Sequence, residues 1–225
     1  MNRLKPIYDR ARVSFQETIR PNAHMAELIR AARTELLSTL SSPPASPNLG
    51  SADTQRGRDA ASHLPRSNNP APYVGVHIRK GDRHPAAISF YREGTIPLTK
   101  YAAAARQAWA RFYENGSSED MSSDKEDRYP APPVMWLASD SPAAVHEFEG
   151  SFSAATALFS LNRSANADVR SLAPVREYVQ TEFEQEPLAE RVRLTRGMVV
   201  DLAMVSGLWA YPGEVVPGAV VCAEG

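Results

Sequence analysis

The stretches YVGVHI, residues 73–78, and VMWLAS, residues 134–139, decide the fold that this sequence predicts. Each is a short apolar run, rich in β-branched or aromatic residues and preceded by proline, which is typical of a buried parallel strand. A helix pattern follows each run. Residues 99–113 carry one apolar stripe, and residues 140–142 (DSP) form a helix start signal. Strands that alternate with helices predict a doubly wound parallel α/β sheet.

Further elements are expected on both sides of these two strands. After Asn22, a residue suited to capping, apolar residues recur at helical spacing and predict a helix over 22–40. The N-terminal segment, residues 1–40, is therefore expected to pack on the domain. Downstream we expect a strand at 157–161, helices near 172–184 and 196–209, and a strand at 219–222.

Two segments lack the large apolar residues that a core needs. Residues 41–72 are rich in Pro, Ser, Asn and Ala, and residues 115–133 are rich in Ser, Asp and Glu. Such segments cannot bury enough apolar surface to offset the entropy lost on ordering, so we predict two disordered insertions. A Rossmann-like domain then spans residues 73–225, with 115–133 as a flexible loop.

The overall composition excludes several classes of protein. The 225 residues are 43% hydrophobic and 23% charged, which excludes a wholly disordered, collagenous or coiled-coil chain. Twenty-five Lys and Arg against 26 Asp and Glu give a net charge of −1, so no nucleic-acid partner is expected. No apolar run approaches the roughly 20 residues that span a bilayer, and we expect neither a signal peptide nor a membrane segment.

Metal and disulfide chemistry are not expected either. Cys222 is the one cysteine, which excludes an intrachain disulfide, and its apolar strand predicts a core position. His146 and Glu147 are not followed by the second histidine of a metalloprotease helix. We therefore expect no metal site.

A basic cluster, HIRKGD (residues 77–82), stands where the first predicted strand ends. Ligands bind at the carboxyl edge of open α/β sheets, and strand alternation sends His77 and Arg79 to the same side. The N–H donors of the Arg79 guanidinium match the geometry of phosphate oxygens, and Lys80 adds a second cation. A diphosphate is therefore the expected ligand. The alternative is a solvated turn in which Arg79 pairs with Asp82.

Two aspartates are further candidates. Asp140 follows the second strand, where its carboxylate can accept hydrogen bonds from sugar hydroxyls or position a loop; alternatively, Asp140 or Ser141 caps the next helix. Asp201 lies in a helix with almost no polar face, which predicts burial nearly all round. A buried carboxylate needs a partner, either Arg196 or a ligand with several N–H donors such as guanine. An edge position near solvent is the remaining alternative for Asp201.

Taken in order, YVGVHIRKGD (73–82), VMWLASDSP (134–142), TRGMVVDLAMVSGLW (195–209) and VVC (220–222) resemble motifs of the GDP-fucose-dependent fucosyltransferases, the α-1,6 and protein O-fucosyltransferase superfamily. The resemblance covers most of the chain outside the two predicted insertions. It implies that residues 73–225 form the C-terminal, nucleotide-sugar-binding half of a GT-B fold. It also implies metal-independent, inverting transfer of fucose from GDP-fucose to a glycan or glycoprotein acceptor, with no further cofactor.

The resemblance also assigns roles to residues. Arg79 matches the arginine that binds the β-phosphate and stabilises the departing diphosphate, and Lys80 stands where the family often has a second arginine. His77 and Asp201 match the pair that contacts guanine, and Asp140 matches an aspartate at the edge of the nucleotide-sugar site. The predicted donor site therefore comprises His77, Arg79, Lys80, Asp82, Asp140 and Asp201, with Arg79 as the catalytic residue.

The resemblance leaves two functional interpretations. The family implies a Golgi or endoplasmic reticulum lumen, whereas this chain, taken as the whole product, predicts a cytoplasmic protein. After VVC the family continues into a Ser-rich turn and a helix, so we expect a chain truncated at its C-terminus. The alternative function is a non-catalytic remnant that at most binds GDP or serves as an interaction module.

Overall fold

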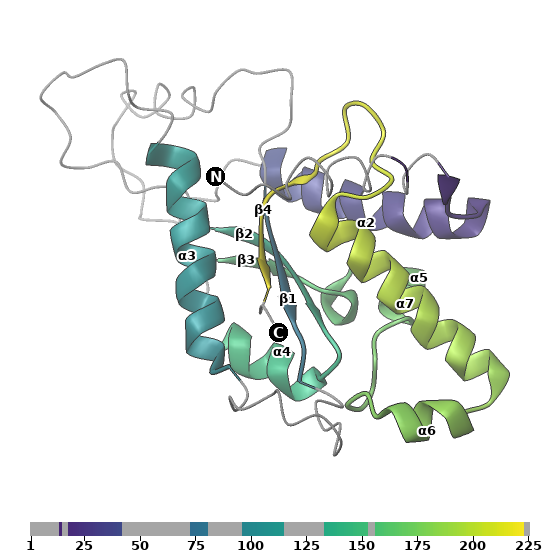
Figure 1. The fold of residues 1–225 in the computed structure, drawn as a ribbon. Coiled ribbons are helices and arrows are strands. Elements are labelled where there is room, and N and C mark those ends of the chain that lie inside the picture. Colours follow the sequence, from purple (N-terminus) through teal and green to yellow (C-terminus); the bar gives the residue numbers. More distant parts are fainter. Residues whose placement is uncertain are drawn as a thin grey trace, which may run out of the picture.

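A four-stranded, all-parallel sheet forms the centre of the structure, a computed structural model (Figure 1). Its strand order is β3-β2-β1-β4. The strands are β1 (Tyr73–Ile78), β2 (Val134–Ser139), β3 (Ala157–Phe159) and β4 (Pro217–Cys222). The structure describes residue 14 and residues 18–41, 73–80, 96–114, 133–152 and 156–222.

Helices cover both faces of this sheet (Figure 1). On one face lie α3 (Leu98–Glu114) and α4 (Pro142–Glu149); on the other lie α7 (Leu188–Ser206) and, packed against it, α2 (Ala23–Ser41). Three short elements connect β3 to α7, namely a 3₁₀ turn (Leu161–Arg163), α5 (Ala167–Arg170) and α6 (Gln180–Gln185). The doubly wound, Rossmann-like α/β sheet predicted from the sequence is thereby confirmed.

Alternation along β1 determines which side chains face which layer. A Cβ atom on Gly75 would lie 2.6 Å from the Val205 carbonyl oxygen, and the Tyr73 hydroxyl donates to the Met204 carbonyl. Odd-numbered residues of β1 therefore face α7, which approaches so closely at Gly75 that no side chain fits. The even-numbered residues, which face α3, are fully buried: Val74, Val76 and Ile78.

The N-terminal segment packs on the domain through α2. Its first turn is capped by Asn22, whose Oδ1 accepts the Met25 N–H at 2.9 Å. The buried face of the helix consists of Met25, Leu28, Ile29, Ala32 and Leu36. Burying each large aliphatic side chain contributes about 1.5–3 kcal/mol, which holds α2 against α7.

The prediction of one helix over 172–184 is wrong. α5 ends at Arg170 and α6 begins only at Gln180. Between the two helices, Nη1 of Arg193 on α7 donates to the Ser171 carbonyl at 2.7 Å and to the Ala173 carbonyl at 3.0 Å. These carbonyls are satisfied by a distant side chain, and the proline that follows them has no N–H to continue a helix.

Other boundaries differ less. The strand predicted at 157–161 ends at Phe159, and α7 begins at Leu188 rather than near 196. α7 ends before Gly207, whose φ of +73° is a left-handed cap that glycine adopts readily. The disordered insertions are predicted at 41–72 and 115–133; apart from Ser41, which ends α2, and Pro133, these residues lie outside the described part of the chain. Within the described ranges, no helix is long and apolar enough to cross a membrane.

Candidate functional site

The carboxyl end of β1 presents the predicted basic cluster to solvent. His77 and Arg79 are exposed, while Ile78 between them is fully buried, so their side chains share one side of the strand. That side is the α7 face, because His77 follows Gly75 in the same alternation. Asp82 lies outside the described residues, so its place in the site and its pairing with Arg79 stay predictions.

Asp140 ties the ends of β1 and β2 together. Its Oδ1 accepts the backbone N–H of Lys80 at 2.8 Å, and its carbonyl accepts the Tyr178 N–H at 2.9 Å. The cap of α4 is Ser141, whose Oγ accepts the Ala144 N–H at 3.3 Å. The expected cap of the helix by Asp140 or Ser141 is therefore confirmed for Ser141, while the Asp140 carboxylate positions the loop after β1.

The Lys80 side chain points away from the α7 face. Its Nζ lies 3.3 Å from Glu147 Oε2 on α4. Because the Glu147 side chain is 64% exposed, water screens the pair and its contribution to stability is small. The contact does, however, orient the Lys80 side chain toward α4. Of the two predicted phosphate-binding cations, Arg79 is therefore the one that shares a face with His77.

Asp201 on α7 points at the sheet and contacts a tryptophan. The Trp136 Nε1–H donates to Asp201 Oδ1 at 3.0 Å. Trp136 is fully buried in β2, paired in register with Gly75, and so lies on the α7 face. Burial raises the pKa of the Asp201 carboxyl to about 7, although the hydrogen bond from Trp136 lowers it. The sequence offered Arg196 as a protein partner, but Arg196 is exposed and an indole N–H serves instead.

Two predicted core assignments are wrong. α7 is not buried all round, since Met198 is 65% and Leu202 46% exposed. The helix packs against the sheet and against α2, and the part of its surface that carries Met198 and Leu202 stays exposed. Cys222 is exposed because β4 is the last strand of the described sheet and alternate residues of β4 point to an uncovered side.

The structure joins two of the predicted site residues by a hydrogen bond and places others on one side of the sheet. Lys80 and Asp140 are hydrogen-bonded at the carboxyl edge. His77, Arg79 and Asp201 share the α7 face, where His77 pairs in register with Ala138, which points to the same side of β2 as Trp136. Asp201 lies on this side opposite Trp136, level with Gly75 in the middle of β1, and His77 lies two residues nearer the carboxyl edge, at which nucleotides bind in such folds.

Three residues of this region were not identified from the sequence. Gly75 carried a usable signal, because glycine inside a strand marks a close backbone approach. Trp136 carried a weaker one, since a buried indole N–H needs an acceptor and Asp201 was a carboxylate in need of a donor. The contribution of Glu147 had no sequence signal, because it depends on how α4 is oriented on the sheet.

The arrangement suits an anionic organic ligand. Within the described residues, no group of three or more His, Cys, Asp or Glu side chains is placed to hold a metal ion. Comparisons with protein-family models, with curated proteins and with solved structures found no match to this chain.

Proposed function

We propose that this chain forms the donor-binding half of a fucosyltransferase-like glycosyltransferase, which binds GDP-fucose and transfers fucose to a glycan or glycoprotein acceptor. One observation carries the proposal: Arg79 and His77 are exposed on one face of a parallel sheet, directly beside the bond between Lys80 and Asp140. Open parallel sheets bind nucleotides at this edge, because the strand-end loops expose polar groups there. The motifs that supply these residues are the ones that resemble the family.

Arg79 binds the diphosphate in this proposal and stabilises it as the leaving group. Negative charge builds on the β-phosphate as its bond to fucose breaks, and a fixed guanidinium interacts most strongly at that moment. The hydrogen bond from the Lys80 N–H to Asp140 fixes the backbone immediately after Arg79. This anchor reduces the positional freedom that the arginine must lose in the transition state.

His77 and Asp201 recognise the base. Guanine presents two adjacent N–H donors. A carboxylate can accept both hydrogen bonds, as it does from the guanidinium group of an arginine. Asp201 Oδ1 already accepts the Trp136 N–H, so the proposal uses the other oxygen and requires the ionised carboxylate. Because the pKa of Asp201 is about 7, GDP binding is expected to strengthen as the pH rises through 7.

Calorimetric titration of the purified chain with GDP tests the donor site. Arg79→Ala is expected to weaken binding by roughly tenfold or more, because a charge-assisted contact to phosphate is lost. Arg111→Ala is the matched control, since Arg111 is an exposed arginine on α3, on the other face of the sheet. ADP controls for the base. A folded wild-type chain that does not bind GDP contradicts the proposal.

Transfer is tested separately, by following the release of GDP from GDP-fucose with and without glycan and glycoprotein acceptors. Release that depends on an acceptor and on Arg79 supports the transferase. Binding of GDP without any release supports the alternative, a chain that binds the nucleotide without catalysis. The proposed activity implies the Golgi or endoplasmic reticulum lumen, which fractionation of cells that express the gene product tests.

A further inference from the structure

α7 lies on the outside of one face of the sheet and exposes one apolar stripe (Figure 1). Leu188 is 69% and Val192 39% exposed at the beginning of the helix, and Met198 and Leu202 extend the exposed surface toward its end. Thr195, which is also exposed, stands between them. Steps of three or four positions keep these residues on one side of a helix, and at 1.5 Å per residue the stripe runs for about 21 Å.

The opposite side of α7 is fixed against the rest of the fold. Gly197 is buried there, and a Cβ atom on it would lie 2.6 Å from the Leu172 carbonyl oxygen. Arg193 Nη1 donates to the Ser171 carbonyl at 2.7 Å, and Nη2 donates to Glu190 Oε1 at 2.6 Å. Because α7 cannot turn about its axis without losing these contacts, the stripe faces outward in one fixed direction, which reduces the entropy that binding must overcome.

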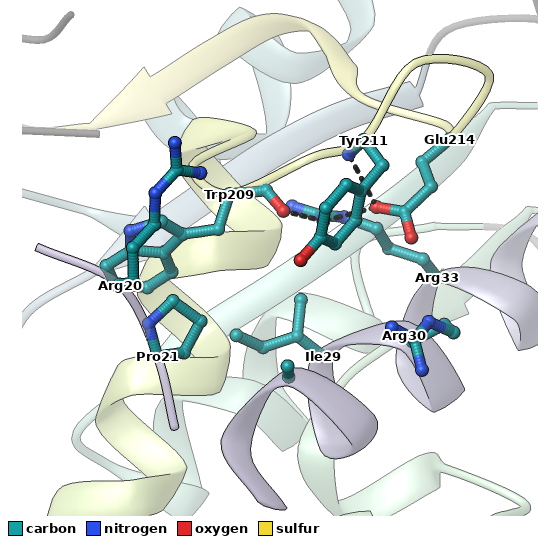
Figure 2. Close-up of a pocket in the computed structure, with 9 residues that line it drawn as sticks. Arg20, Pro21, Ile29, Arg30, Arg33, Trp209, Tyr211 and Glu214 are labelled. Atoms are coloured by element: carbon teal, nitrogen blue, oxygen red, sulfur yellow. Dashed lines mark hydrogen bonds and ion pairs between the residues drawn. The ribbon is translucent and has the colours of Figure 1, made fainter. Parts of the chain in front are cut away.

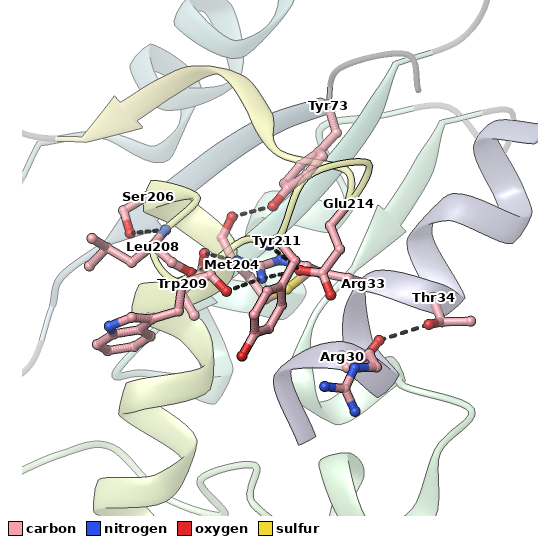
Figure 3. A network of polar contacts seen from close by, with 11 residues as sticks. Arg30, Arg33, Thr34, Tyr73, Met204, Ser206, Leu208, Trp209, Tyr211 and Glu214 are labelled. Atoms are coloured by element: carbon pink, nitrogen blue, oxygen red, sulfur yellow. Dashed lines mark hydrogen bonds and ion pairs between the residues drawn. The ribbon is translucent and has the colours of Figure 1, made fainter. Parts of the chain in front are cut away.

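After the stripe, α7 is covered by α2 and by the loop that leads to β4 (Figure 3). The Arg33 side chain of α2 is 3% exposed, and its Nη1 donates to the Trp209 carbonyl at 3.1 Å and to Glu214 Oε2 at 2.8 Å. The loop held in this way forms one wall of a cavity of about 320 Å³ (Figure 2). This cavity lies at the amino edge of the sheet, because the loop immediately precedes β4. Residues 203–205 are buried, so the stripe ends at Leu202.

A hollow of about 360 Å³ lies over the first half of the stripe, between α6 and α7. Phe183 of α6 lines it together with Leu188, Val192 and Thr195 of α7. The Phe183 ring packs against Tyr178, with the ring centroids 5.5 Å apart, which supports the α6 wall. A hollow with such walls can receive one large apolar side chain of a partner, and side chains buried in this way carry most of the binding energy of an interface.

Two arginines of α7, Arg191 and Arg196, also line this hollow. Five positions correspond to about 140° around the helix axis, so the two arginines stand on opposite borders of the stripe. Neither forms an ion pair with a residue in the described part of the chain, where Arg191 Nε is also without a hydrogen-bond partner. The acidic residues of α7 are engaged elsewhere, since Glu190 pairs with Arg193 and Asp201 points at the sheet.

The acidic residues of the α6 wall are engaged as well. Glu182 and Glu186 both pair with Arg176, and Glu184 accepts a hydrogen bond from Gln180. Both border arginines of the stripe therefore have N–H donors to offer to the carboxylates of a partner.

We propose that this stripe binds an amphipathic helix of a partner protein, in which glutamates or aspartates border the apolar side chains. One large apolar side chain of the partner fills the hollow, and a carboxylate on each border of the partner meets Arg191 or Arg196. Helices dock on apolar surfaces in this way, through side chains three, four and seven positions apart. The surface goes beyond the proposed donor site and is separate from it, because Asp201 on the same helix points at the sheet.

Two other occupants fit the stripe less well. A second copy of this chain, laid stripe to stripe, offers no free carboxylate of α7 to either arginine, because Glu190 and Asp201 are engaged. An anionic membrane surface offers charge but no discrete side chain for the hollow. The combination of an apolar hollow with one arginine on each border favours the acidic amphipathic helix.

Fluorescence anisotropy with two labelled synthetic peptides tests the proposal. Both peptides repeat a heptad with leucine at the apolar positions; one has glutamate and the other lysine on the two borders. We expect the glutamate peptide to bind the purified chain saturably and the lysine peptide to bind at least roughly tenfold more weakly. A proline in the middle of the glutamate peptide is expected to abolish binding, because it breaks the helix.

Reversal of the two border charges is the decisive variant. Arg191→Glu with Arg196→Glu is expected to weaken the glutamate peptide by roughly tenfold or more and to strengthen the lysine peptide, a gain that a misfolded chain cannot produce. Lys100→Glu with Arg111→Glu is the matched control, which reverses two exposed cations of α3 on the other face of the sheet. This control is expected to leave the affinity for both peptides unchanged.

Truncation of exposed apolar side chains tests the stripe itself. Leu188→Ala with Leu202→Ala is expected to weaken the glutamate peptide by roughly tenfold. Val175→Ala is the control, because Val175 is 84% exposed and lies outside the stripe. Equal binding of the two peptides, binding of neither, or unchanged affinity after charge reversal would overturn the proposal. So would self-association of the wild-type chain in sedimentation that Leu188→Ala with Leu202→Ala abolishes, or binding to phosphatidylserine vesicles without binding to either peptide.

Discussion

Asp201→Asn is expected to stabilise the folded chain at pH 8 and to have a much smaller effect near pH 4. Burial raises the pKa of the Asp201 carboxyl from 3.8 to about 7, so its ionised form is costly in the folded state. An asparagine keeps a side-chain oxygen that can accept the Trp136 N–H, and it has no charge to bury.

The magnitude follows from the two pKa values. Between pH 3.8 and about 7 the folded chain keeps the Asp201 proton that the unfolded chain has released, so the free energy of unfolding falls as the pH rises. At 1.36 kcal/mol for each pH unit between the two pKa values, the loss above pH 7 has an upper limit of about 4 kcal/mol, because the Asp201 side chain is half-buried and water screens part of its charge. Asparagine does not titrate, and the variant therefore recovers up to that amount.

Urea unfolding at pH 4 and pH 8 measures the difference. Asp168→Asn is the matched control, because Asp168 is exposed on α5, and it is expected to change the free energy of unfolding by less than about 1 kcal/mol at either pH. If the gap between Asp201→Asn and wild type were the same at both pH values, the Asp201 carboxyl would not be held with a raised pKa, and the burial argument would be refuted.

Three further predictions concern packing, the α7–β4 loop and base recognition. Gly75→Ala places a Cβ 2.6 Å from a backbone oxygen of α7 and is expected to cost about 1–3 kcal/mol in urea unfolding, whereas Gly150→Ala, with its nearest contact at 3.4 Å, is expected to be nearly neutral; equal effects would contradict the close approach. Arg33→Met leaves Glu214 without its buried partner and is expected to cost about 3–5 kcal/mol in thermal or urea unfolding, so a loss below about 1 kcal/mol would show that Arg33 does not hold the loop. GDP affinity is expected to rise between pH 6 and pH 8 in the wild type but to lose that dependence in Asp201→Asn; calorimetry that finds the same pH profile in both would remove Asp201 from base recognition.

The two central strands could be predicted with their bounds. β1 and β2 begin and end where the apolar runs do, because a parallel strand covered on both faces is a continuous apolar segment. The bounds of the helices were predicted with more variable accuracy. α2 follows its apolar stripe closely, whereas α7 extends to Leu188, well before the apolar segment from which it was predicted.

The candidate site could be predicted in part. The chain order places His77 and Arg79 after one strand and Asp140 after the next, and parallel pairing brings the two strand ends to one edge. The burial of α7 could not be predicted in the same way. Its apolar residues indicate a buried helix, but which face meets the sheet and which stays exposed depends on how many layers cover it, as Met198 shows.

The sequence by itself determined the alternation of strands and helices, because hydrophobic periodicity and helix-start residues act over a few neighbouring positions. Only the tertiary structure decided the partners of the charged groups. Asp140 meets the Lys80 N–H across 60 positions, Asp201 meets Trp136 across 65, and Arg33 meets the Trp209 carbonyl across 176. Partners so far apart are chosen by the packing of layers and not by local pattern, and that packing sets the pKa of Asp201 and builds the cavity at the amino edge.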